Sequence, residues 1–127
     1  MLMENGHILI VEDEESLLKL ESILLSSKGY KVTGVRDGLA ALSEIEKCKP
    51  DLILLDIMMP GIDGFEVCRR IKDNPDTKDI PIVMLTAKKS VADQARGAEV
   101  GANAYMTKPF KSLKIIDVIS GLLPKNK

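Results

Sequence analysis

Polar side chains follow the apolar runs of this sequence at the point where each run ends. In chain order they are Glu12, Asp13, Asp56, Thr86 and Lys108. One such run, 52–55, is typical of a strand buried on both faces of a parallel sheet. Ligands of open α/β sheets bind beyond the carboxyl ends of the strands, so these side chains are predicted to meet at one edge. Taken alone, Asp56 would fit equally well as a residue that closes the turn after its strand.

Three carboxylates at one edge repel one another unless a counter-charge lies between them. A hard divalent cation, for which Mg²⁺ is the leading candidate, binds such oxygen ligands while it keeps several waters. Lys108 would add a second positive charge, and Thr86 a hydroxyl donor. Two cations and a hydroxyl can stabilise the equatorial oxygens of a phosphoryl group while Asp56 acts as the nucleophile. The pattern therefore predicts an aspartyl phosphate.

Ten alternating segments must position these residues. Apolar and β-branched runs predict strands, three- and four-residue apolar spacing predicts helices, and Gly, Pro and Asp clusters predict the turns between them. The expected strands are 7–11, 30–35, 52–56, 80–86 and 104–107, and the expected helices begin near 16, 39, 65, 87 and 113. This alternation predicts a flavodoxin-like, doubly wound α/β fold with five helices and a five-stranded parallel sheet of order 2-1-3-4-5. We expect one domain over residues 1–127, with a core at about 6–123.

Composition excludes several classes of function. The 127 residues carry 18 basic and 19 acidic side chains, a net charge of -1 that does not favour nucleic acid or an anionic membrane as a partner. The sequence contains neither a signal-peptide pattern nor a membrane-spanning apolar run, so a cytoplasmic protein is expected. Cys48 and Cys68 lack metal-ligand spacing, and His7 is the only histidine, which disfavours a zinc site or a thiol nucleophile.

Other functions on the same fold lack the residues that they need. A nucleotide or flavin binder needs free backbone N–H groups after the first strand, but residues 12–15 there are all acidic. A phosphatase that turns over needs a second acid close behind its nucleophile, but position 58 is Met. An interaction module on the same fold that is never phosphorylated remains as a third alternative.

Four blocks of the sequence, in this order, resemble the response-regulator receiver domain of two-component signalling. They are residues 8–14, 54–64, 84–87 and 105–110. The resemblance covers essentially the whole chain. It implies that Asp56 accepts a phosphoryl group from a phosphohistidine on a sensor histidine kinase or a histidine phosphotransfer protein. It also implies a protein that is not a multiple-turnover enzyme, although slow autodephosphorylation would be expected.

The same resemblance implies a role for each residue at the site. Mg²⁺ would be held by Asp13, Asp56 and the backbone carbonyl of Met58, with Glu12 acting through water. Thr86 and Lys108 would bind the phosphoryl oxygens. A shift of Thr86 would let Tyr105 rotate, and this switch would be read on the surface of 87–100, 104–107 and 113–123. The peptide bond between Lys108 and Pro109 is a candidate cis bond.

Two features depart from the family's usual pattern, one at Glu12 and the other at Met58 and Lys88. Many members have Asp at the position of Glu12, and the longer side chain can still reach the hydration shell of the metal. Met58 and Lys88 stand where members tune hydrolysis of the phosphoryl group, and neither is suited to orient a water. We therefore expect a comparatively long-lived phosphorylated state.

The chain ends after its last helix, so we expect either a stand-alone receiver or part of a longer regulator with an output domain. A phosphorylation-dependent dimer is a further assembly to test.

Overall fold

The computed structural model describes residues 6–86, 91–107 and 112–123. Within them the strands are β1 (His7–Val11), β2 (Lys31–Val35), β3 (Leu52–Asp56), β4 (Ile82–Thr86) and β5 (Ala104–Thr107). The helices are α1 (Glu15–Ser27), α2 (Gly38–Lys47), α3 (Gly64–Asp73), α4 (Val91–Glu99) and α5 (Ser112–Leu122). The five strands are parallel and follow the order β2-β1-β3-β4-β5. The predicted fold class is confirmed.

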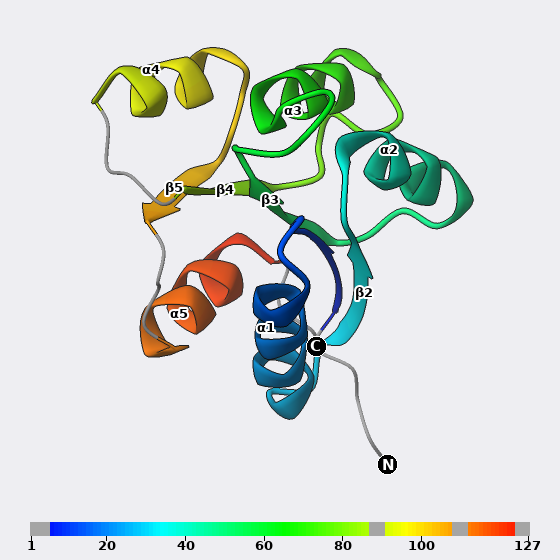
Figure 1. Cartoon of the computed structure of the whole chain (residues 1–127), viewed down its shortest axis with the longest axis vertical. Coiled ribbons are helices and arrows are strands. Elements are labelled where there is room, and N and C mark those ends of the chain that lie inside the picture. The colour runs from blue at the N-terminus through cyan, green and yellow to red at the C-terminus, as the bar shows by residue number, and fades with distance from the viewer. Residues whose placement is uncertain (1–5, 87–90, 108–111, 124–127) are drawn as a thin grey trace.

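Helices cover both faces of the sheet, α1 and α5 on one face and α2, α3 and α4 on the other (Figure 1). Alternate residues of the central strands supply the two cores. Leu9, Ile53 and Leu55 pack with α2 and α3, whereas Ile8 and Leu54 pack with α1 and α5. Every residue of β3 is buried. Packing on both sides therefore fixes the position of whatever side chain stands at the end of this strand.

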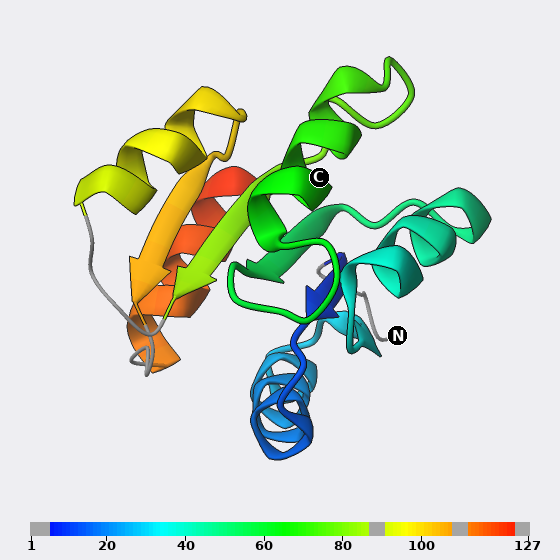
Figure 2. The same cartoon turned by 45° about the horizontal axis from the view of Figure 1, so that its top comes forward.

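All strands run in one direction, so their carboxyl ends share an edge (Figure 2). Two of the helices that start at this edge, α2 and α3, are capped by aspartates. Asp37 accepts a hydrogen bond from the N–H of Ala40 at 2.7 Å, and Asp63 accepts one from the N–H of Glu66 at 3.0 Å. Each satisfies a backbone donor at a helix start and so fixes where the chain re-enters the helix.

The predicted boundaries differ from the observed ones by a few residues. β4 begins at Ile82 rather than at position 80, because Pro81 has no N–H to donate to the strand ladder. α3 begins at Gly64, directly after its Asp63 cap, and continues to Asp73. The predicted start of the fourth helix, at 87, lies outside the described residues. None of these differences moves a described residue of the predicted site to another edge of the sheet.

Candidate functional site

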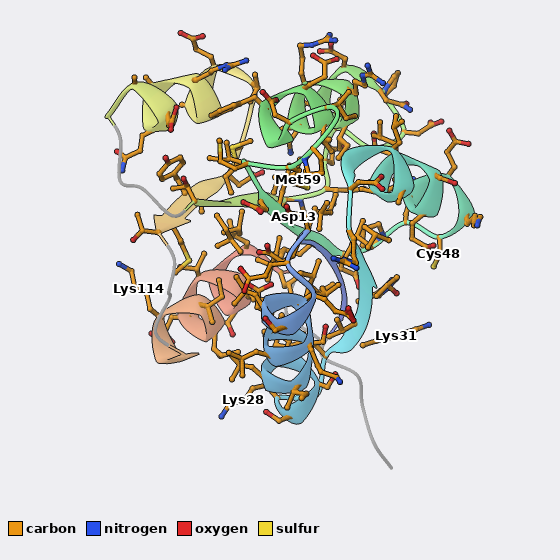
Figure 3. The ribbon with its side chains drawn as sticks, viewed as in Figure 1. Asp13, Lys28, Lys31, Cys48, Met59 and Lys114 are labelled. Atoms are coloured by element: carbon orange, nitrogen blue, oxygen red, sulfur yellow. The ribbon has the colours of Figure 1, made fainter. Side chains whose placement is uncertain are left out.

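Three carboxylates of the predicted site lie together where β1 and β3 end. One oxygen each from Glu12, Asp13 and Asp56 lies within 4.8 Å of the others. Glu12 and Asp56 are 1% and 3% exposed, whereas Asp13 is half-buried. Asp13 stands where the ribbon leaves the sheet for α1 (Figure 3). Negative charges this close repel one another, and a set of oxygen donors alone suits a hard divalent cation.

The sheet itself brings these acids together. Val11 lies opposite Leu55 in the parallel pairing of β1 with β3, so the next residues, Glu12 directly after β1 and Asp56 at the end of β3, lie side by side. The N–H of Glu12 donates to the carbonyl of Val35 at 3.0 Å, which keeps the end of β1 next to β2. The N–H of Glu14 donates to the Glu12 carboxylate at 3.2 Å. These two hydrogen bonds thus hold the backbone on either side of Asp13.

The loop after Asp56 is held by backbone hydrogen bonds and by the buried side chains of Ile57 and Met59, while Met58 between them is exposed. The N–H of Met58 donates to Oδ1 of Asp56 at 3.2 Å, which orients the carboxylate. The N–H of Ile57 donates to the carbonyl of Leu85, and that of Gly64 to the carbonyl of Ile57, both at 3.0 Å. The Met58 side chain is 72% exposed. The aspartate is therefore fixed, and the residue two positions later faces solvent.

Thr86 and Tyr105 lie on the strands beyond β3. Asp56 pairs with Leu85, so Thr86 ends β4 one residue further along, and it is 3% exposed. Tyr105 in β5 is half-buried beneath α4, where a methyl group placed on Gly97 would lie 3.6 Å from its ring. The predicted phosphoryl-binding residue Lys108, the Lys108–Pro109 cis bond and the tuning residue Lys88 lie outside the described residues and stay predictions.

Sequence reasoning missed one residue at this edge, Arg36. It follows β2 directly, and its Nε and Nη2 atoms donate to the backbone carbonyl of Asp13 at 3.3 and 2.8 Å. Its Nη1 atom lies 3.9 Å from the Glu15 carboxylate. The available signal was position, since Arg36 stands at the carboxyl end of the second strand just as Glu12 does at the first. Its charge gave no such signal, because exposed arginines are common.

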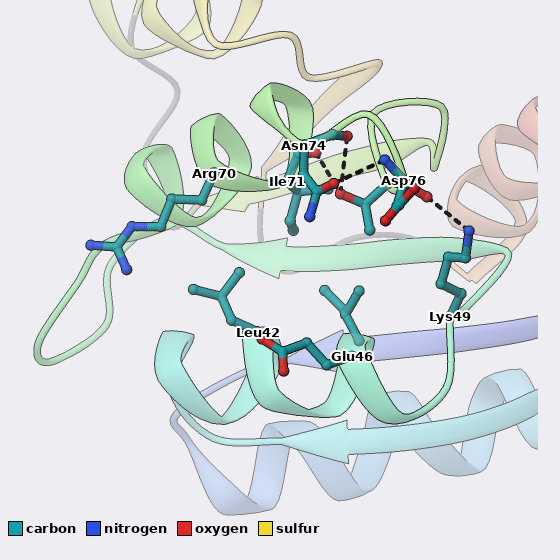
Figure 4. Close-up of a pocket in the computed structure, with 9 residues that line it drawn as sticks. Leu42, Glu46, Lys49, Arg70, Ile71, Asn74 and Asp76 are labelled. Carbon is teal, nitrogen blue, oxygen red and sulfur yellow. Dashed lines mark hydrogen bonds between the residues drawn. The ribbon is translucent and has the colours of Figure 1, made fainter.

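A cavity of about 580 Å³ lies away from the acidic edge, between α2 and the end of α3. Leu42, Ile45 and Ile71 line its apolar part. Lys49 and Asp76 stand at one end, where the Lys49 ammonium donates to the Asp76 carbonyl at 2.8 Å, and Arg70 stands at the other (Figure 4). None of the acids that follow β1 and β3 lines it. The carboxylate cluster is therefore the better candidate for chemistry.

A model of the response regulator receiver domain matches residues 8–120. The chain belongs to this family. Receiver domains are the signalling domains of two-component response regulators, and the acidic cluster at the ends of β1 and β3 fits the metal and phosphorylation site of such a domain. The predicted family is confirmed.

Several relatives resemble this receiver domain closely. It is 40% identical to the response regulator PleD of Caulobacter vibrioides over 118 residues, which are 93% of this chain and 26% of PleD. The chemotaxis response regulator CheY4 of Vibrio cholerae is 31% identical, with a TM-score of 0.88 over 94% of this chain and 99% of CheY4. The receiver domain of the sensor histidine kinase PA1611 from Pseudomonas aeruginosa has a TM-score of 0.86 at 32% identity, over 93% of this chain and 97% of that one. That structure has a magnesium ion coordinated in its active-site cleft.

The chain spans only 26% to 54% of the length of the curated relatives it matches. Some of those relatives are named as transcriptional regulatory proteins. Among the described residues, no helix is both long enough and apolar enough to span a membrane.

Proposed function

We propose that this receiver domain takes a phosphoryl group onto Asp56 from a phosphohistidine of a partner histidine kinase or histidine phosphotransfer protein. The observation that carries the proposal is the convergence of Glu12, Asp13 and Asp56 within 4.8 Å. Thr86, buried at the end of the neighbouring strand, supports it as the hydroxyl for the phosphoryl oxygens. Lys108 is proposed as the second phosphoryl-binding side chain.

The proposed transfer forms one bond and breaks another. A carboxylate oxygen of Asp56 attacks phosphorus, the bond from phosphorus to the donor imidazole nitrogen breaks, and the electron pair leaves with that nitrogen, which takes up a proton. The Met58 N–H donates to Oδ1 of Asp56 and so holds the nucleophile in one orientation before the donor arrives. Positioning and electrostatic stabilisation supply most of the catalysis in such transfers, because there is little covalent chemistry for the protein to perform.

Asp13, Asp56 and the backbone carbonyl of Met58 are proposed to hold Mg²⁺, with Glu12 acting through water. When bound, Mg²⁺ would neutralise the carboxylates and the charge on the transferring phosphoryl oxygens. The buried position of Glu12 suits an indirect role, since its carboxylate already accepts the Glu14 N–H. The magnesium ion in the PA1611 receiver domain, a structure 32% identical to this chain, supports the choice of metal.

The signal is proposed to leave the site through Thr86 and Tyr105. A phosphoryl group adds nearly two negative charges beside Thr86, and a shift of Thr86 toward it vacates space for the Tyr105 ring. Tyr105 lies under α4, so its rotation would change the surface formed by α4, β5 and α5. Phosphorylation biases this equilibrium only by its differential affinity for the two states, so some active molecules are expected without it.

We also propose the extent, the cellular location and the partners of the domain. Residues 1–127 are proposed as one receiver domain with its core at about 6–123, located in the cytoplasm and not acting as a multiple-turnover enzyme. Its downstream partner would be another protein or an output domain, with a phosphorylation-dependent dimer as one form. We propose no direct binding of nucleic acid or membrane by this segment.

Intact-mass spectrometry tests the proposal. The protein is incubated with Mg²⁺ and a small-molecule phosphodonor such as acetyl phosphate, beside an Asp56→Asn control. We expect one phosphoryl addition that needs Mg²⁺ and is absent from the Asp56→Asn variant. No addition would support an interaction module that is never phosphorylated, and catalytic release of phosphate would support a phosphatase.

A further inference from the structure

The first loop of the site lacks the usual support at the start of the helix that follows it. Residue Glu14 is the N-cap of α1, but its side chain makes no capping hydrogen bond in the described structure. Its Oε1 atom instead accepts the hydroxyl of Ser16 at 3.2 Å. A capping side chain normally fixes the entry into a helix. Something else must therefore hold the segment that carries Asp13.

Arg36 supplies this support from the neighbouring strand. Its guanidinium places two donors on the Asp13 carbonyl, at 3.3 and 2.8 Å, and a third nitrogen lies 3.9 Å from the Glu15 carboxylate. One residue earlier, the Val35 carbonyl accepts the N–H of Glu12 at 3.0 Å. The end of β2 thus holds three of the four acidic residues that follow β1, two by their backbone and one by charge.

We infer that Arg36 is a positioning residue that sets the Asp13 carboxylate for the divalent cation by holding the Asp13 backbone carbonyl. The contact is to the backbone, which leaves the carboxylate of Asp13 in the cluster with Glu12 and Asp56. A planar guanidinium can present two N–H groups to one oxygen, whereas a lysine ammonium acts as a single point charge on a flexible stem. This inference rests on the proposed function, because it assigns a partner residue to the same metal site.

Two roles for Arg36 predict opposite changes in Mg²⁺ affinity when its side chain is removed. If Arg36 acted only through its charge, its removal would strengthen Mg²⁺ binding, since a positive side chain beside a cation site repels the cation. If it positions Asp13, removal weakens Mg²⁺ binding despite the lost repulsion. Partners that orient metal ligands typically change metal affinity by about 10- to 100-fold when mutated. We expect the lower end, about tenfold, because the Arg36 side chain is 57% exposed.

The test measures Mg²⁺ affinity by calorimetric titration of the metal alone into wild type, Arg36→Gln and Arg36→Lys. Arg69→Gln is the matched control, because Arg69 is a similarly exposed arginine, 52%, that pairs with carboxylates on α3 instead. We expect both Arg36 variants to bind Mg²⁺ about tenfold more weakly and the control to match wild type. Unchanged or tighter binding by Arg36→Gln overturns the inference, and so does full retention of affinity by Arg36→Lys.

Two further measurements separate positioning from misfolding and from failure of the proposed function. Urea unfolding in EDTA should leave Arg36→Gln close to the Arg69→Gln control, because an exposed contact contributes little to global stability. A large loss of stability in Arg36→Gln alone would overturn the inference in favour of a structural role. In phosphodonor assays, Arg36→Gln should need about tenfold more Mg²⁺ for half-maximal phosphorylation but reach the wild-type rate at saturation.

The results with the wild-type chain distinguish a failure of the proposed function from a failure of the role inferred for Arg36. A wild-type chain that binds Mg²⁺ but accepts no phosphoryl group would overturn the proposed function, while the Mg²⁺ titrations still decide the role of Arg36. A wild-type chain that binds Mg²⁺ and is phosphorylated, with an Arg36→Gln variant of equal affinity, would overturn the role of Arg36 alone. A wild-type chain that binds no Mg²⁺ overturns both.

Discussion

Substitution of Gly64 by alanine should distort the backbone of the proposed phosphoacceptor itself. A Cβ atom at Gly64 would lie 2.5 Å from the carbonyl oxygen of Asp56 and 2.8 Å from the Cα of Ile57. Both are backbone atoms of a buried strand end, so no side chain can rotate away to relieve the contact. Overpacking typically costs about 1–3 kcal/mol, and we expect the upper end, about 3 kcal/mol, because backbone must move.

Two other glycines provide a graded comparison for Gly64→Ala. A Cβ at Gly38 would lie 2.6 Å from Cγ1 of Ile62 and 2.7 Å from Cγ2 of Val67, which are side-chain atoms that can partly yield. A Cβ at Gly121 of α5 would meet nothing within 4 Å. Alanine there should be neutral or stabilising by about 0.5–1 kcal/mol, because glycine is the poorer helix former.

Urea unfolding followed by circular dichroism measures this series. With a slope of about 2 kcal/mol per molar urea, Gly64→Ala should lower the midpoint by about 1.5 M, Gly38→Ala by less, and Gly121→Ala not at all. Phosphoryl addition to Gly64→Ala should also slow, since the displaced atoms belong to Asp56. The reasoning is refuted if Gly64→Ala loses less than about 1 kcal/mol or is more stable than Gly38→Ala.

Three further substitutions probe other contacts. Met58→Asn should shorten the lifetime of the phosphorylated state, because an amide can orient water where a solvent-exposed thioether cannot, and equal decay by intact mass would contradict this. Arg69 and Arg70 lower the pKa of Glu66 to about 2 from 4.5. The ionised Glu66 carboxylate therefore stabilises the folded state fully above pH 4.5, and this stabilisation is lost as the pH falls toward 2. Glu66→Gln should accordingly show a shallower acid dependence of folding stability than wild type, most clearly at low salt. Lys72→Met removes an ammonium that donates to the Ile80 carbonyl at 2.7 Å and to two further oxygens, and should cost about 1–3 kcal/mol in urea unfolding. An unchanged midpoint would contradict it.

The fold was predictable because the apolar pattern is clear in the central strands of the sheet. Leu52–Leu55 is an uninterrupted apolar run, and every residue in it is 0% exposed. Runs of this kind identify central strands, and short turns between alternating elements leave few topologies for a parallel sheet. The acids after these strands met at one edge because the pairing of Val11 with Leu55 follows from the same topology. The part of the site that is formed by strand ends alone could thus be predicted from the sequence.

Contacts made by long exposed side chains could not be predicted in this way. Arg36 reaches the Asp13 carbonyl across 23 residues of sequence, and Lys72 reaches the Asn103 side chain across 31. Neither partner belongs to a periodic pattern, and an arginine or lysine on the surface can adopt many rotamers of similar energy. Only the packing of the strands and loops determines which oxygen lies within its reach. Residues that support a site from outside are therefore harder to predict than residues that form it.

The burial of the site determines where the domain could change under the proposed phosphorylation of Asp56. Asp56 and Thr86 are each 3% exposed, and the strands that carry them are packed on both faces, so neither strand can move without opening a core. The loop after β3 is different, because Met58 is 72% exposed and a methyl group on Gly61 would meet nothing within 4 Å. A phosphoryl group added to Asp56 must therefore be accommodated by the loops and by small shifts of buried side chains such as Thr86. Under the proposed function, this division would let a rigid sheet carry a switch, since the strands keep Asp56 in place while the segments beyond their ends respond to the added charge.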